Sequence, residues 1–185
     1  MQNLLAVKNR EEFRAWLFEN AGIETECWLV LKRGKPQDSG KFYYLDAVEE
    51  ALCFGWIDST TKRVDGEHYQ RFSPRKKNSL WSELNKERVR RLEKLGLMTD
   101  FGREVLPDMD FVMDEEVKAE LEREGVLEKL LEFPSLYVRV RTYNVAFFKN
   151  RDKKAYERAL AHLIEETKKG RTFGEWNDYG RLLEY

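Results

Sequence analysis

The residues best suited to chemistry gather in one block, residues 54–85, FGWIDSTTKRVDGEHYQRFSPRKKNSLWSELN. Arginines and hydroxyls there precede a predicted helix start, where unpaired N–H groups and the helix dipole attract anions. Arg71 and Arg75 would make bidentate contacts, and Ser79 or Ser82 would add a hydroxyl. The block predicts a seat for phosphate, sulfate or carboxylate at the junction of hairpin and helix. In the simpler interpretation the serines only cap the helix and the cations pair with acids elsewhere.

A carboxylate and a lysine stand on the strand predicted just before the hairpin. If that strand is regular, Trp56, Asp58, Thr60 and Lys62 share one face, because side chains alternate along a strand. Asp58 beside an indole could act as acid or base, with the two arginines as clamps on a developing negative charge. This enzyme of unknown reaction is an alternative to binding, although a lone carboxylate near a lysine is more often a structural ion pair. No residue is assigned as catalytic.

Three tryptophans with polar neighbours could line a pocket or stack on a ring of a ligand. The last of them opens the tail motif Trp176–Arg181, which we expect to dock back onto the sheet or the basic block. Core packing is the simpler role for all three. The predicted ligand-binding residues are Trp56, Asp58, Lys62, Arg71, Arg75, Ser79, Trp81, Ser82 and Asn85, with Trp176, Asn177 and Arg181 as pocket lining from the tail.

Other chemistries have little support in the sequence. There is no nucleophile elbow or phosphate loop, and no cofactor is expected. His68 and His162 lack a His, Cys or carboxylate partner at ligand spacing, so no metal is expected. Cys27 and Cys53 lie in apolar surroundings without a CxxC spacing and are predicted to be reduced core thiols.

The net charge is −1, but the charges are unevenly distributed. Residues 62–94 hold 11 Lys and Arg against 5 Asp and Glu, and residues 100–132 hold 4 against 12. A basic face of this kind could bind nucleic acid backbone without sequence preference, which is the second alternative function. The acidic segment could instead neutralise it from within the chain.

Periodicity and turn signals predict the elements of the first half. Asn9 and Glu12 have capping-box spacing ahead of a helix over residues 10–20. A strand over 25–32 and a helix over 45–54 follow, the helix ending at Gly55. Asp65-Gly66 is a favoured two-residue turn and predicts a hairpin of strands 56–64 and 68–72.

The second half reads as helix almost throughout. Apolar stripes and capping residues predict helices over 84–95, from Thr99 to 106, from Asp114 to Gly125, from Pro134 to 147, and from Asp152 to Gly170. The fold class is α+β, a small antiparallel sheet of about three strands covered by helices, with a mostly helical C-terminal half. Residues 1–98 would form the α+β core and residues 99–185 a helical portion on the same core, one domain rather than two.

The location follows from what the sequence lacks. The first ten residues have no basic start followed by an apolar run, and no stretch approaches the length of a membrane span. We expect a soluble, cytoplasmic protein with a small anionic or aromatic ligand as its partner.

Several long strings resemble the bacteriocin-protection, YdeI or OmpD-associated (YdeI/OmdA) family. They are YLDAVEEALCFGWID, KRVD, QRFSPRKKNSLWSELNKERV, LMT and the closing GEWNDYGRL, which together span nearly the whole chain. The resemblance implies an α+β protein tied to stress or bacteriocin resistance and, by name, to porins. It supplies no reaction and no catalytic residue. Without an export signal at the start, porin association is not expected here.

Overall fold

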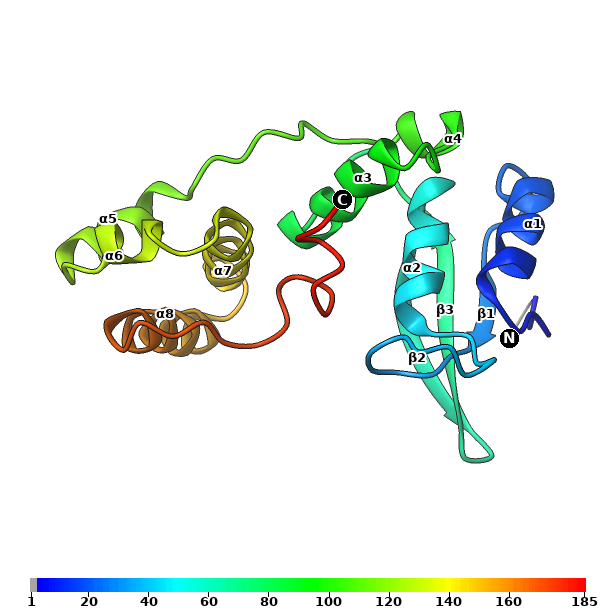
Figure 1. Cartoon of the computed structure of the whole chain (residues 1–185), viewed down its shortest axis with the longest axis horizontal. Coiled ribbons are helices and arrows are strands. Elements are labelled where there is room, and N and C mark those ends of the chain that lie inside the picture. The colour runs from blue at the N-terminus through cyan, green and yellow to red at the C-terminus, as the bar shows by residue number, and fades with distance from the viewer. Residues whose placement is uncertain (1–2) are drawn as a thin grey trace. The chain divides into compact units, whose positions relative to one another are not determined.

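The computed structural model describes residues 3–185 as an α+β fold, as the sequence predicted (Figure 1). The sheet has three antiparallel strands in the order β1-β3-β2. In chain order the elements are α1 (Arg10–Asn20), β1 (Cys27–Val30), α2 (Tyr44–Cys53), β2 (Trp56–Val64), β3 (Glu67–Pro74), α3 (Glu83–Lys94), α4 (Asp100–Arg103), α5 (Glu115–Arg123), α6 (Leu127–Leu131), α7 (Ser135–Phe148) and α8 (Lys153–Lys168).

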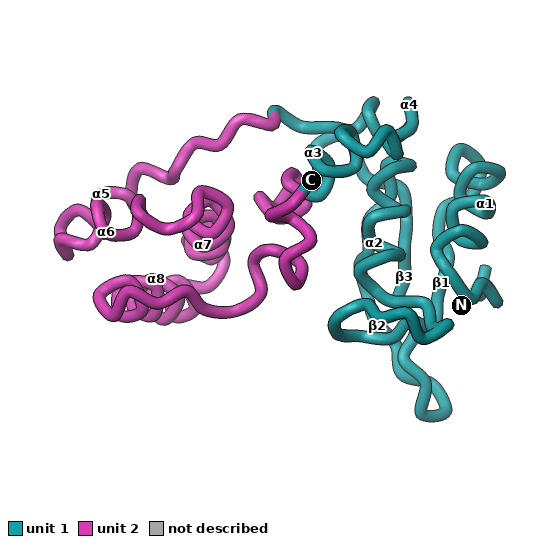
Figure 2. Tube along the Cα trace, viewed as in Figure 1, with its two compact units in different colours: residues 1–80, 88–108, 185 teal, residues 81–87, 109–184 magenta. Residues whose placement is uncertain are grey.

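The chain divides into two compact units (Figure 2). Unit 1 comprises residues 1–80, 88–108 and 185, and unit 2 comprises residues 81–87 and 109–184. The division therefore does not fall at the expected 98/99 boundary. Helix α3 contributes its first residues to unit 2 and the remainder to unit 1.

Local signals in the sequence set the element ends in unit 1. The Glu12 N–H donates to Asn9 Oδ1 at 2.8 Å, and the Glu12 carboxylate accepts from the Lys8 N–H at 2.8 Å, which confirms a helix start of the capping-box kind. Asp65 and Gly66 both have positive φ, as the tight hairpin turn requires.

Strand register shows which side chains share a face of the sheet. Cys27 pairs with Phe72, and Phe72 also pairs with Asp58, so these three side chains point to one face. Phe72 lies 5.6 Å from the Phe13 ring of α1, which identifies that face as the one packed on helices. Trp28 pairs with Arg71 and points to the opposite face.

The core of unit 1 lies between this face and the helices α1 and α2. Its fully buried side chains include Phe13, Leu17, Leu29, Leu52 and Phe72. Both cysteines are free and buried in this unit. Burial raises the pKa of each thiol to about 12, which confirms inert core cysteines.

Unit 2 is helical, with a core of its own. Its largest cluster of buried apolar side chains draws on α5 to α8 and includes Val117, Leu121, Leu130, Tyr137 and Leu163. Helix α6 was not predicted from the sequence; it has only five residues and no side-chain cap at Val126. No helix among residues 3–185 combines the length and the apolar character needed to cross a membrane.

Candidate functional site

The predicted site residues do not assemble as the sequence suggested. Trp56 is 1% exposed and its indole N–H donates to the Ala21 carbonyl at 3.2 Å. Trp81 is 6% exposed. These two tryptophans therefore belong to the interior and do not offer a free ring face to a ligand.

A bulge in β2 separates Asp58 from Lys62. Asp58 pairs with Phe72, whereas Thr61 pairs with Gln70, so β2 holds one residue more than β3 over this stretch. The extra residue reverses the alternation, and Lys62 points to the opposite face, 4.9 Å from the Trp28 ring. The predicted face shared by Trp56, Asp58 and Lys62 is therefore wrong.

The two arginines of the predicted anion seat have protein partners. Arg71 Nε lies 2.7 Å from Glu26 Oε2, on the sheet face away from the helices. Arg75 is buried, and its Nη1 donates to Ser79 Oγ at 3.3 Å and to the Leu80 carbonyl at 3.2 Å. Arg71 is thus neutralised by a carboxylate, and Arg75 stabilises the loop that precedes α3.

The serine hydroxyls near α3 bond to groups of the protein, as in the simpler interpretation that the serines only cap the helix. The Asn85 N–H donates to Ser82 Oγ at 3.2 Å, so Ser82 is the N-terminal cap of α3. Ser79 serves as an acceptor for Arg75.

The tail docks within unit 2. The Trp176 ring meets the Tyr137 ring of α7 edge-on at 5.6 Å and packs with Leu136, Val140 and Leu182. Asn177 Oδ1 accepts from the Gly180 N–H at 2.9 Å and shapes the terminal turn. The Arg181 side chain is partly buried.

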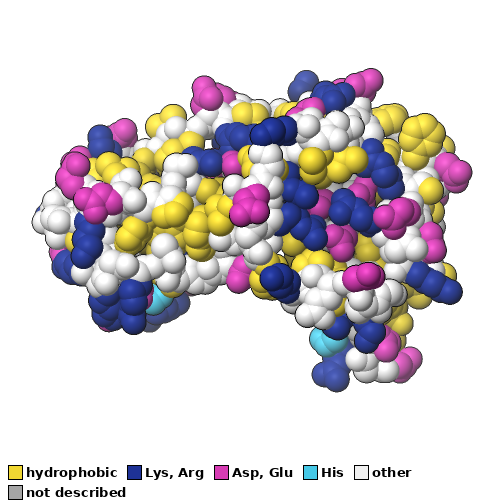
Figure 3. Space-filling model, in the orientation of Figure 1, with side chains coloured by type: hydrophobic (Ala, Val, Ile, Leu, Met, Phe, Trp, Pro, Cys, Tyr) yellow, Lys and Arg dark blue, Asp and Glu magenta, His cyan; other side chains and the backbone are white. Residues whose placement is uncertain are grey.

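Part of the acidic segment forms ion pairs with lysines of unit 2. Lys149 of unit 2 pairs with Asp114 at 3.1 Å and Glu116 at 2.9 Å, and Lys168 pairs with Glu124 at 3.0 Å. Acidic and basic side chains are intermixed on the face drawn in Figure 3. On this face, acidic side chains lie between the basic ones, whereas a continuous basic track favours binding to nucleic acid backbone.

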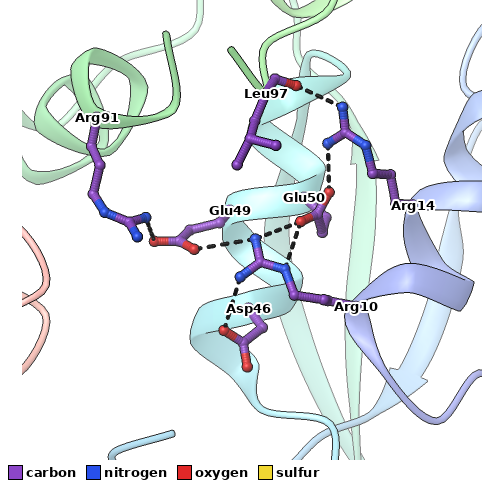
Figure 4. A network of polar contacts seen from close by, with 7 residues as sticks. All are labelled: Arg10, Arg14, Asp46, Glu49, Glu50, Arg91 and Leu97. Carbon is purple, nitrogen blue, oxygen red and sulfur yellow. Dashed lines mark hydrogen bonds and ion pairs between the residues drawn. The ribbon is translucent and has the colours of Figure 1, made fainter. Parts of the chain in front are cut away.

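A buried ionic network holds the helices of unit 1 (Figure 4). Glu49 and Glu50 of α2 are 0% and 2% exposed. Arg14 donates to Glu50 at 2.8 Å and to the Leu97 carbonyl at 2.7 Å, and Arg91 donates to Glu49 at 2.8 Å. Each of these carboxylates pairs with an arginine, so we interpret the network as structural. Removing one partner of such a buried pair lowers the free energy of unfolding by about 3–5 kcal/mol.

Arg10 completes this network from α1. Its guanidinium donates to Glu50 at 2.5 and 2.9 Å and lies 3.5 Å from Asp46. Burial lowers the pKa of Arg10, but the neighbouring carboxylates outweigh it, and the net shift is upward. Arg10 therefore stays charged and joins α1 to α2.

Beside the hairpin lies a hollow of about 440 Å³, which we call the hairpin hollow; its lining residues are Leu31, Arg33, Thr61, His68, Tyr69 and Gln70. The Arg33 guanidinium stacks 3.8 Å from the centre of the Tyr44 ring, and its Nη2 donates to Gln70 Oε1 at 2.7 Å. Sequence reasoning missed Arg33 because it follows β1, about twenty residues before the block at residues 54–85.

Tyr44 links this hollow to Asp58. Its hydroxyl donates to Asp58 Oδ2 at 2.6 Å. Burial, reinforced by the charge of Asp58, raises the pKa of Tyr44 to about 12. The ring therefore remains a neutral donor below Arg33, and Asp58, which the sequence singled out, orients Tyr44.

One group of possible metal ligands was missed. His162, Glu165 and Glu166 have ligand atoms within 4.8 Å of one another on α8, at helical spacings of three and four residues. The expectation that His162 has no carboxylate neighbour is therefore wrong. Hydrogen bonds from Lys169 and Arg171 lower the pKa of Glu165 and Glu166 respectively, so both carboxylates already have cationic partners.

Fold and site together define an α+β domain with a hollow walled by a sheet hairpin and an arginine. Residues 5–105 match a domain of unknown function, DUF8412, and because this is more than half of the chain, the protein belongs to that family. The match covers all of the sheet and the hairpin hollow. No curated protein and no solved structure matches the chain.

Proposed function

We propose that this protein binds a small organic anion, such as an aromatic carboxylate, in the hairpin hollow. The observation that carries the proposal is the placement of Arg33, stacked on Tyr44 and hydrogen-bonded to Gln70 at the wall of that hollow. This moves the predicted anion site from the start of α3 to the hairpin itself.

Arg33 suits an anion better than the arginines chosen from the sequence. Among residues 3–185 it has no carboxylate within ion-pair distance, whereas Arg71 pairs with Glu26. Stacking on a ring and one bond to Gln70 fix the guanidinium plane, so less entropy is lost when a ligand binds. The donors that remain match the two oxygens of a carboxylate.

The other walls complement an aromatic or apolar ligand body. Leu31 and Tyr69 supply apolar surface, and Thr61 and His68 supply polar groups at the exposed side. A charge-assisted bond from Arg33 would contribute about 1.5–3 kcal/mol.

A binding assay with a matched arginine variant tests this proposal. Benzoate and sulfate should raise the melting temperature of the wild type, and Arg33→Gln should weaken benzoate binding roughly tenfold or more, as measured by calorimetry. Arg151→Gln is the control, because Arg151 also lies on an aromatic ring, Phe147 at 4.0 Å, but belongs to unit 2. A flat response to all anions contradicts the proposal, and a loss with Arg71→Gln alone would return the site to the position predicted from sequence.

We further propose the biological setting that the sequence resemblance implies, a stress or bacteriocin-resistance role in the cytoplasm. Two free, buried thiols are compatible with a reducing compartment. Cell fractionation and the bacteriocin sensitivity of a strain lacking the protein test these two points separately.

A further inference from the structure

A second hollow of about 500 Å³ lies where the segment before α1 meets the end of β1. We call it the lysine hollow; its lining residues are Val7, Lys8, Val30, Leu31, Lys32, Gly40, Lys41, Phe42 and Glu67. The sequence does not indicate this hollow, because its three lysines are spread over more than thirty residues.

Backbone hydrogen bonds bring the three lysines together. The Lys32 N–H donates to the Phe42 carbonyl and the Tyr44 N–H donates to the Lys32 carbonyl, both at 2.9 Å, which anchors Lys41 next to the end of β1. The Leu5 N–H donates to the Trp28 carbonyl at 3.0 Å, so the segment carrying Lys8 runs beside the same strand. The cluster is thus a product of main-chain pairing and not of flexible side chains alone.

The lysine charges are uncompensated by acids. None of Lys8, Lys32 and Lys41 has a carboxylate within ion-pair distance in residues 3–185, and Glu67 is the one acidic residue in the lining. The Lys32 ammonium lies 5.3 Å from the centre of the Tyr43 ring. A hydrogen bond with Ser39 is the largest cause of the lowered pKa of Tyr43; burial opposes it, and Lys32 and Lys41 lower the pKa further.

Acidic side chains of the adjoining hollow largely have other partners. That hollow shares Lys8, Gly40, Lys41 and Phe42 with the lysine hollow. Among its acids, Glu12 accepts from the Lys8 N–H at 2.8 Å and Asp46 lies 3.5 Å from Arg10. These two carboxylates serve the capping box and the buried network. Glu11 and Asp38 also line the adjoining hollow, and Glu67 lines the lysine hollow itself, but none of them lies within ion-pair distance of the three lysines.

The remaining lining is apolar. Val7, Val30, Leu31 and Phe42 supply aliphatic and aromatic surface in the hollow that the three lysines line. Three positive charges favour a dianion over a carboxylate, and phosphate offers several acceptor oxygens to lysine donors that need no fixed plane. Apolar walls favour an ester over inorganic phosphate.

We propose that the lysine hollow is a binding site for a phosphate monoester with an apolar or aromatic body. The lysine hollow shares Leu31 with the hairpin hollow, but none of its three lysines lines that hollow, and its existence does not depend on the proposed function. The phosphate would lie among Lys8, Lys32 and Lys41, with the ester group against Phe42 and Val30. A soluble ester and a phospholipid headgroup share this chemistry.

The experiment titrates the whole protein with phenyl phosphate, inorganic phosphate and phenol, followed by calorimetry and ³¹P NMR. Phenyl phosphate should bind more tightly than either of its parts. Lys41→Gln and Lys32→Gln should each weaken it roughly tenfold, the ratio that one charge-assisted contact of about 1.4 kcal/mol produces. Lys35→Gln is the matched control, because Lys35 is exposed in the same loop and does not line the hollow.

Further arms separate the sources of phosphate and the two hollows. Vesicles containing phosphatidic acid that sediment wild-type protein, but not Lys41→Gln, would identify a headgroup as the phosphate source and support the site. Loss of benzoate binding with Arg33→Gln and loss of phenyl phosphate binding with Lys41→Gln are separate readouts, so the two proposals can fail independently. The proposal is overturned if neither phenyl phosphate nor the vesicles bind, or if they bind equally to the wild type and the lysine variants.

Discussion

At the scale of single residues, Asp58 shows how a side chain can be correctly selected and wrongly interpreted. The sequence offered Lys62 as its partner, whereas its hydroxyl donor is Tyr44, fourteen residues earlier and 2.6 Å away. The Arg33 guanidinium then covers the same ring. Asp58 therefore positions the Tyr44 ring on which Arg33 stacks, and its contacts do not support an acid-base role.

Removing the Tyr44 hydroxyl should alter the dependence of stability on alkaline pH. The folded-state pKa of about 12 exceeds the ordinary tyrosine value near 10. The contribution of Tyr44 to the free energy of unfolding is therefore complete below pH 10 and is lost as the pH rises through 12. The loss should amount to roughly 2–3 kcal/mol. Urea unfolding of wild type and Tyr44→Phe between pH 9 and 12 measures it.

The raised pKa values of the two cysteine thiols also make the protein less stable as the pH rises. The informative quantity is therefore the difference in stability between wild type and Tyr44→Phe. Asp58→Asn is the companion variant. It should shrink the pH-dependent difference without abolishing it, since burial is the larger cause of the shift. Parallel profiles for wild type and Tyr44→Phe would contradict this account.

At the scale of elements, a close approach of α4 to the end of α2 fixes one side of unit 1. Thr99 caps α4 and its hydroxyl donates to the Cys53 carbonyl at 2.6 Å. A Cβ on Gly102 would lie 2.4 Å from that same carbonyl oxygen and 2.8 Å from Met98 Cε. A side chain at this position would therefore clash with the backbone of α2, and only glycine fits.

Gly102→Ala should destabilise the protein by roughly 2–4 kcal/mol, because backbone must move to relieve the contact. Chemical denaturation measures the change. Gly22→Ala is the matched control, since its Cβ would meet the Phe101 ring at an ordinary 3.5 Å and its φ is not positive. Equal effects of the two substitutions would contradict the close approach at Gly102 as the cause.

Most elements could be predicted because their ends are local. Asn9, Asp114 and Asp152 each cap the helix that the sequence assigned to them, with side-chain oxygens accepting from the first turn. The bulge in β2 could not be predicted, because Thr60 and Thr61 suit either register and only pairing with β3 decides between them. One inserted residue then moved Lys62 to the other face.

At the scale of the whole molecule, each unit has its own buried apolar cluster. In unit 2 this cluster is built from α5 to α8, and Leu163 of α8 is fully buried in it. Helix α3 belongs to both units. Cooperative opening of unit 2 alone is therefore expected to be the first response to a defect in its core.

Leu163→Ala should lower stability by about 2–5 kcal/mol, the usual range for a buried leucine. Hydrogen exchange should show the lost protection within residues 109–184, with the strands of unit 1 still protected. Leu131→Ala is the control, because Leu131 is 52% exposed and its removal opens no cavity. Equal loss of protection in both units would show a single cooperative fold.

The sequence by itself determined the α+β class, the helix caps, the hairpin and the burial of Cys27 and Cys53. These features follow from helix, strand and turn propensities and from hydrophobic periodicity, which depend on residues close together in the sequence. Only the tertiary structure decided where charge is left without a partner. It paired Arg71 with Glu26 and enclosed Arg75, and it gathered Arg33 in one hollow and three lysines in another, because main-chain pairing joins segments that sequence spacing keeps far apart.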